Sequence, residues 1–126
     1  MTDFKFPKAE KLKQKREIDL LFAKGKWLSL ENLRIISIDL DKNPQEDFEI
    51  ANQKFGVSVS KKYFKRATDR NRIKRLLREV YRHNKDLFLE HFGLHSVSML
   101  FWVSGEKPSD LKSLEDNFVN LCKSKK

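Results

Sequence analysis

The sequence predicts a mixed α/β sandwich built on one β-sheet, and three observations support this. Residues 55–60 alternate bulky apolar with small side chains, which is the period of a β-strand. Residues 69–89 carry apolar side chains at helical spacing, and the remaining segments alternate between helix and strand patterns. The 126 residues have the length of one domain, so we expect residues 1–126 to share one core.

The first predicted helix follows a basic lead-in. We expect this lead-in, residues 1–14, to be flexible and poorly ordered because it is a basic terminal segment. Three apolar residues at helical spacing then predict a short helix over residues 15–24, and Gly25 is placed to end it. These three residues are Ile18, Leu21 and Phe22.

Two strands are predicted next. β-Branched residues favour a strand over residues 33–40, and the polar, acidic stretch 41–53 is typical of a connecting loop. The second strand, residues 55–60, has one face of very small side chains: Gly56, Ser58 and Ser60. Two interpretations of that face stay open. A ligand or another backbone segment approaches it closely, or a partner helix packs tightly on it.

The helix predicted over residues 69–89 has two distinct stripes. Its apolar stripe consists of Ile73, Leu76, Leu77, Val80, Asn84 and Leu87. Its polar stripe consists of Asn71, Arg75, Arg78 and Arg82. A buried strand is expected over residues 97–103, followed by a helix over residues 109–121 that is capped by Ser109.

The net charge of the chain is concentrated in one segment. Residues 54–82 contain eleven basic and two acidic residues, and their net charge of +9 equals that of the whole chain. Such a concentration indicates a polyanionic partner, although a solvated basic surface is the alternative. A membrane surface is a weaker alternative, because the apolar stripe of the basic helix is needed for the core.

Other chemistry is poorly represented. Cys122 is the single cysteine, so no internal disulfide forms and a cytoplasmic location is expected. His91 and His95 lack further metal ligands, and the acidic residues 39–43 fit a polar loop better than a calcium site. The longest apolar run is too short to span a membrane, and no signal peptide is evident. We expect no catalytic side chain, no metal or cofactor held by the protein alone, and no small-molecule substrate.

Two runs of residues carry a resemblance to a known family. The first, FGVSVSKK, occupies residues 55–62, and the second, RNRIKRLLRE, occupies residues 70–79. A strand of this kind placed at this distance before an Arg-Asn-Arg helix resembles the bacterial ribonuclease P protein component. The early helix with Phe22 and Gly25, and the later strand and helix, follow in the order of that family.

The resemblance implies a fold and a function. The fold is an αβββαβα sandwich related to the second domain of ribosomal protein S5, with a left-handed crossover around the Arg-Asn-Arg helix. The function is that of the protein subunit of ribonuclease P, an endoribonuclease that removes the 5′ leader of precursor tRNA. In that family the protein binds the RNA subunit and the leader. The RNA and its Mg²⁺ ions carry the catalysis.

The resemblance also assigns binding residues. Together with the charge pattern, it predicts RNA contacts for Lys61, Lys62, Lys65, Arg70, Asn71, Arg72, Lys74, Arg75, Arg78 and Arg82. A leader cleft between the first helix and the sheet is expected to include Phe22. Ile18 stands where many relatives carry a second Phe, so simple apolar contact is expected to replace stacking at that position.

Three other functions are weighed against this one. A ribosomal or other structured-RNA-binding protein without a role in cleavage has the same composition and differs only in the strand-and-helix motif. A DNA-binding module normally needs a helix before its recognition helix, whereas a strand and the basic residues 61–68 precede this one. An autonomous nuclease needs an acidic cluster to hold metal, and the sequence offers none.

Overall fold

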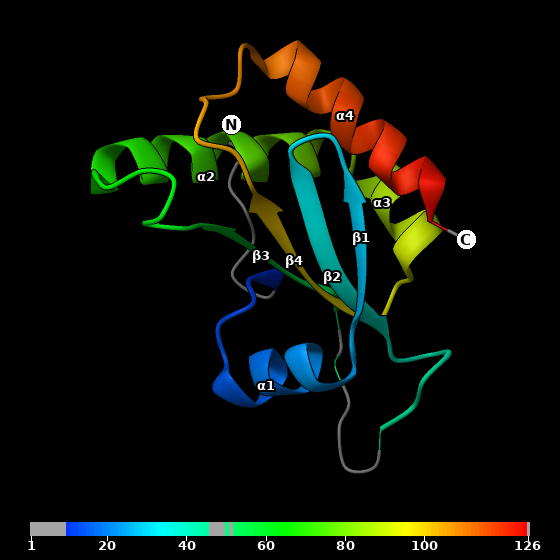
Figure 1. Ribbon diagram of the computed structural model, residues 1–126. Helices are drawn as coiled ribbons and strands as arrows, with labels where there is room; N and C mark the ends of the chain where they lie inside the picture. The colour runs from blue at the N-terminus through cyan, green and yellow to red at the C-terminus, as the bar shows by residue number, and fades with distance from the viewer. Residues whose placement is uncertain (1–9, 46–49, 51, 126) are drawn as a thin grey trace, which may run out of the picture.

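The sheet has a mixed topology. In the computed structural model, placement is described for residues 10–45, 50 and 52–125. Within this part of the chain, β1 (Lys26–Leu30), β2 (Leu33–Asp39), β3 (Lys54–Val59) and β4 (Ser96–Trp102) form one sheet in the order β1-β2-β4-β3 (Figure 1). β2 is antiparallel to both β1 and β4, and β3 is parallel to β4.

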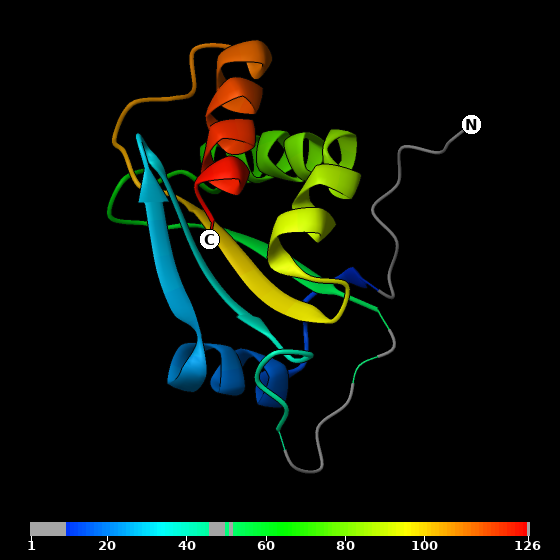
Figure 2. The ribbon, with the colours of Figure 1, turned by 90° about the vertical axis from the view of Figure 1, so that its right-hand side faces the viewer.

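The helices lie on opposite faces of the sheet. Among the described helices, only α1 (Lys15–Lys24) lies on one face, where it contacts β2 and β4. α2 (Ala67–His83), α3 (Lys85–Phe92) and α4 (Leu111–Ser124) cover the other face (Figure 2). The predicted α/β sandwich is thus confirmed, and none of the described helices is long and apolar enough to cross a membrane.

The main core lies between the sheet and the helices α2, α3 and α4. Its centre is aromatic, with the rings of Phe55 and Tyr81 stacked at 3.9 Å and Phe88 edge-on to both. A smaller apolar cluster under α1 includes Leu21 and Ile36, both fully buried. Successive side chains of a strand point to opposite faces of the sheet, so the sheet contributes side chains both to the main core and to the smaller cluster under α1.

The end of the predicted lead-in is ordered, which corrects the expectation for residues 10–14. Lys11 forms a parallel bridge with Phe55, and the Leu12 amide donates to the Phe55 carbonyl oxygen at 3.1 Å. A Cβ placed on Gly56 would lie 3.2 Å from the Leu12 Cβ, so the small residue makes room for the Leu12 side chain of this segment. Of the two interpretations of the small face, approach of another backbone is the correct one at Gly56. Residues 1–9 lie outside the described part.

A polar cluster fixes this N-terminal segment to the helices. The Tyr81 hydroxyl donates to Glu10 Oε1 at 3.2 Å and accepts from Gln53 Nε2 at 2.9 Å. Lys85 forms an ion pair with Glu10 Oε2. We call Glu10, Gln53, Tyr81 and Lys85 the N-terminal latch. Its members come from four segments, and Glu10, Gln53 and Tyr81 are buried.

The predicted long helix is divided in two, which corrects the expectation of one helix over residues 69–89. The break lies at Asn84, whose backbone leaves the helical region at φ −122° and ψ 28°. Its side-chain nitrogen donates to the Val80 carbonyl oxygen at 2.9 Å and to Glu115 of α4 at 2.8 Å. An Asn side chain competes with helical hydrogen bonds, and here it redirects the chain over the core.

Two further elements differ from the sequence prediction. β1 was not located by residue pattern, although the αβββαβα order implied by the resemblance includes it. The cap of α4 is Asp110 and not Ser109, because the Asp110 carboxylate accepts from the Ser113 amide at 2.7 Å. That hydrogen bond also lowers the pKa of Asp110.

Candidate RNA interface

The exposed side of α2 carries the predicted phosphate contacts. Asn71, Arg72, Arg75 and Arg78 are exposed and form what we call the basic helix face. Within the described residues, none of these three arginines makes a hydrogen bond or an ion pair. Arg presents planar, bidentate donors that suit phosphate, and this face repeats them at intervals of about one helical turn.

The predicted lysines occupy the turn between β3 and α2. Lys61, Lys62 and Lys65 are exposed, and Lys74 of α2 is half-buried. The turn is held by Ser60, whose carbonyl oxygen accepts from the Tyr63 amide and whose hydroxyl accepts from the Lys62 amide, both at 3.1 Å. The three lysines therefore extend the basic helix face from an ordered turn.

Arg70 has a structural contact inside the predicted site. Its Nη1 donates to the carbonyl oxygens of Phe64 and Lys65, at 2.9 and 2.8 Å. Both acceptors belong to the turn that carries the lysines. Arg70 thus links the first turn of α2 to this basic turn, like a brace. The sequence pattern alone did not reveal this contact.

Arg82 lies apart from the basic helix face. Its side chain is only 17% exposed, and its Nη2 lies 3.2 Å from Glu79 Oε1. The polar stripe predicted from the sequence therefore turns inward at its C-terminal end. The helical phase of Arg82 was predicted correctly, but sequence spacing alone did not reveal its pairing with the carboxylate of Glu79, one turn earlier.

The opposite face of the sheet carries an exposed aromatic patch beside α1. Phe22 is 48% and Trp27 44% exposed, and Phe101 lies 6.3 Å from the Phe22 ring and 5.5 Å from the Trp27 ring. The Arg34 guanidinium carbon lies 4.1 Å from the Trp27 ring centroid. We call Phe22, Trp27, Phe101 and Arg34 the aromatic patch. Ile18 is half-buried and packs against the smaller apolar cluster under α1.

Small residues of β3 keep part of this patch open. Ser58 lies directly beside Phe101 in the β3–β4 register, so its short side chain leaves one edge of the ring uncovered. Sequence reasoning found Phe22 and missed the other three residues, which come from three separate strands. Their signal was weak: Trp27 and Arg34 are exposed residues of strands, and Phe101 stands within a run expected to be buried.

The single cysteine and His95 lie in environments that do not activate a nucleophile. Burial raises the pKa of the Cys122 thiol to about 12, so the thiol stays protonated at neutral pH. His95 pairs with Asp41 at 2.9 Å on the surface, away from Cys122. Among residues 10–45, 50 and 52–125, no group of three or more His, Cys, Asp or Glu side chains is placed to hold a metal ion.

Comparison with known proteins decides among the RNA-binding alternatives. The family model described as Ribonuclease P matches residues 6–126, almost the whole chain. The chain belongs to the ribonuclease P protein family. This membership makes it a partner of ribonuclease P RNA and part of an endoribonuclease complex that acts in tRNA 5′ maturation, as the strand-and-helix motif predicted.

Individual relatives agree with this ribonuclease P assignment. The ribonuclease P protein component of Porphyromonas gingivalis is 35% identical over 115 residues, which cover 89% of this chain and 80% of the relative. That of Dictyoglomus thermophilum is 38% identical over 109 residues, covering 86% and 79%. The ribonuclease P protein of Staphylococcus aureus has the same fold, with a TM-score of 0.70 at 20% identity over 93% of this chain and 95% of that chain.

Proposed function

We propose that this chain binds the single-stranded 5′ leader of precursor tRNA on the aromatic patch while the basic helix face lies against ribonuclease P RNA. The observation that carries the proposal is the exposure of the Phe22 and Trp27 rings beside Arg34, on the face of the sheet that carries α1. Exposed aromatic rings bind unpaired bases by stacking, which tolerates any sequence. A factor that meets many different leaders needs that tolerance.

The chain path joins the two surfaces. β3 passes Phe101 at Ser58, and the basic turn with Lys61 and Lys62 follows directly after the strand. A nucleic-acid strand that leaves the aromatic patch along β3 therefore meets lysines next and the arginines of α2 after them. Phosphate contacts fix position, and ring contacts hold the bases.

In this proposal the RNA subunit and its Mg²⁺ ions carry out the hydrolysis, and Mg²⁺ supplies the activated water and charge stabilisation. The protein residues bind and orient. In this proposal the protein itself holds no metal ion. We place this activity in the cytoplasm, where the single thiol of Cys122 stays reduced.

Reconstitution tests the proposal. The full chain is combined with a candidate ribonuclease P RNA, and precursor tRNA cleavage is measured at low Mg²⁺ with and without protein. We expect the protein to stimulate cleavage and to increase the preference for precursor over mature tRNA. Stimulation without that preference would contradict leader binding. Binding of the RNA with no stimulation at all would instead favour a structured-RNA-binding protein.

A further inference from the structure

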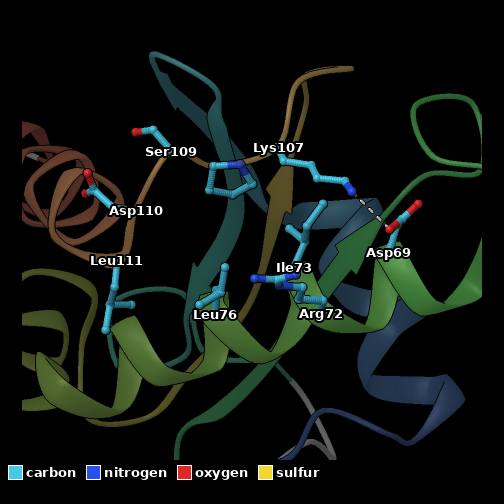
Figure 3. A pocket seen from close by; sticks show the side chains of 9 residues that line it. Asp69, Arg72, Ile73, Leu76, Lys107, Ser109, Asp110 and Leu111 are labelled. Carbon is cyan, nitrogen blue, oxygen red and sulfur yellow. Dashed lines mark ion pairs between the residues drawn. The ribbon is translucent and has the colours of Figure 1, made fainter.

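A pocket lies between α2 and the loop that leads into α4. It has a volume of about 270 Å³ and is lined from both sides, with Ile73 and Leu76 on α2 and Pro108 and Leu111 on the loop and α4. Figure 3 shows Lys107 and Asp69 paired at one end and Asp110 and Leu111 at the other. This pocket is separate from the aromatic patch, which lies on the opposite face of the sheet.

The lining has an apolar interior and a charged mouth. Ile73 is almost fully buried and, with Leu76, forms the floor on α2. At the mouth, Lys107 Nζ lies 3.2 Å from Asp69 Oδ1, so these charges offset each other. Arg72 also lines the pocket and is exposed. The mouth therefore has one guanidinium without a carboxylate partner among the described residues.

The wall opposite α2 is the loop between β4 and α4, and hydrogen bonds at both ends of this loop hold it in place. The Trp102 indole nitrogen donates to the Glu106 carbonyl oxygen at 2.8 Å, and the Val103 amide donates to Asn32 at 2.9 Å. Asp110 caps α4 through its hydrogen bond with Ser113. A pocket whose walls are already fixed loses little entropy when a ligand enters.

Arg72 belongs both to this pocket and to the basic helix face. An RNA backbone that contacts Arg75 and Arg72 along α2 thus passes the mouth of the pocket. Apolar walls suit the face of a planar heteroaromatic ring, and a guanidinium at the mouth suits the phosphate attached to it. Proteins recognise RNA in this way, by holding unstacked bases in pockets beside backbone contacts.

We propose that this pocket accepts one unpaired nucleobase of the RNA bound along α2, with Arg72 on the adjacent phosphate. The inference rests on the proposed RNA-binding role of α2 and goes beyond it, because it assigns a second base site away from the leader. The Lys107–Asp69 ion pair bounds the pocket at one end (Figure 3), which favours one base over a stack of several.

Nuclear magnetic resonance with small probes tests the chemistry of the pocket. The full chain is titrated with adenosine 5′-monophosphate and, separately, with ribose 5-phosphate at equal concentration. We expect the nucleotide to shift the amide signals of residues 107–111 saturably, and the sugar phosphate to leave them unchanged. Equal shifts with both probes would show a phosphate site only, and unchanged signals with both would overturn the proposal.

Pocket-filling variants test the same site with RNA. Leu111→Trp places a ring in the pocket, and Leu94→Trp on an exposed turn is the matched control. Provided that both variants keep the wild-type spectrum, Leu111→Trp is expected to weaken binding of ribonuclease P RNA about tenfold, while Leu94→Trp does not. If Leu111→Trp misfolds, Lys107→Ala against Lys112→Ala replaces the pair, with a smaller loss expected for Lys107→Ala only.

The outcomes separate this inference from the proposed function. If wild-type protein stimulates cleavage and Leu111→Trp binds the RNA equally well, the pocket does not hold a base and the proposed function stands. If wild-type protein neither binds RNA nor stimulates cleavage, the proposed function itself fails. Residues 107–111 that stay fully accessible to hydroxyl radicals in the RNA complex would overturn the inference.

Discussion

The hydroxyl of Tyr81 donates a hydrogen bond to Glu10, 71 residues earlier in the chain, at 3.2 Å. The same hydroxyl accepts from Gln53, and Lys85 pairs with the other carboxylate oxygen of Glu10. Because the ring of Tyr81 is also stacked on Phe55, the N-terminal latch is attached directly to the centre of the core. Buried polar groups of this kind are costly to leave without partners.

Tyr81→Phe tests the N-terminal latch. The change keeps the ring and leaves the Gln53 amide and one Glu10 oxygen without this partner, so we expect the free energy of unfolding to fall by about 1–3 kcal/mol. Urea unfolding measures the loss. Tyr63→Phe, the same change at the other tyrosine, is the control and is expected to alter stability by less than about 0.5 kcal/mol. Equal effects at both positions would show that the latch contributes nothing specific.

Stability is expected to decrease at alkaline pH. Burial raises the pKa of Cys122 to about 12 and raises that of Tyr81 above its ordinary range, so the folded chain holds both protons longer than the unfolded chain. Their contributions are complete below the unfolded pKa values, about 8.5 for the thiol and about 10 for the phenol. They are lost as pH rises, by about 1.4 kcal/mol per pH unit for each group.

Urea unfolding between pH 7 and pH 11 measures this decrease. Cys122→Ala should remove the part that begins near pH 8.5, and Tyr81→Phe the part that begins near pH 10. The free energy of unfolding of each variant is compared with its own value at pH 7, so a pH-independent loss of stability does not affect the comparison. A wild-type profile that stays flat to pH 11 would contradict the prediction.

Arg70→Ala is expected to destabilise the basic turn. Loss of two hydrogen bonds to the carbonyl oxygens of Phe64 and Lys65 should lower the free energy of unfolding by about 1–2 kcal/mol. Arg75→Ala removes an equal charge from an exposed position on the same helix and should change it by less than about 0.5 kcal/mol. Amide hydrogen exchange at residues 61–66 locates the effect, and unchanged exchange there would rule out the brace.

Removing Arg75 and Arg78 together should weaken RNA binding without affecting the fold. Each phosphate contact contributes about 0.7–0.9 to the slope of log K against log salt concentration, so the double Ala variant should flatten that slope by about one to two units. The control is Lys112→Ala with Lys123→Ala, which removes the same charge from exposed positions on α4. If both double variants flatten the slope equally, the effect comes from net charge and not from phosphate contacts on α2.

Phe22→Leu and Trp27→Leu test the aromatic patch. Both side chains are nearly half exposed, so little stability should be lost, while loss of a stacking plane should reduce the preference for precursor over mature tRNA about tenfold. Affinity for ribonuclease P RNA alone is the internal control and should not change. A drop in stability with the preference intact would place the leader elsewhere.

Local pattern was sufficient for the regular elements and not for contacts between distant segments. The apolar stripe around Ile73 and Leu77 located α2, and the alternation at Phe55 located β3, because each pattern repeats over neighbouring residues. The residue pattern did not locate β1 because the strand has only five residues, and the apolar Trp27 lies on the same exposed side as Ser29, which masks the alternation of the half-buried Leu28 and Leu30. The N-terminal latch was not predicted because Glu10 and Tyr81 are 71 residues apart in the sequence and meet only in the folded chain.

The binding surfaces show the same division. Helical phase placed Arg75 and Arg78 on the outside of α2, yet it grouped Arg82 with them, and the resemblance assigned Arg70 to RNA binding together with its neighbours. Their actual environments depend on carbonyl groups of a turn and on Glu79. The aromatic patch joins one helix and three strands, and its assembly required the register of β1, β2 and β4.

The bridge between Lys11 and Phe55 also affects self-association. β3 lies at the margin of the sheet, and a strand at the margin offers unpaired amide and carbonyl groups to a second molecule. The segment around Leu12 covers part of that margin and fills the space above Gly56. The N-terminal segment therefore protects the β3 edge from pairing with a second molecule. We expect a chain truncated past Leu12 to expose this edge and to aggregate more readily.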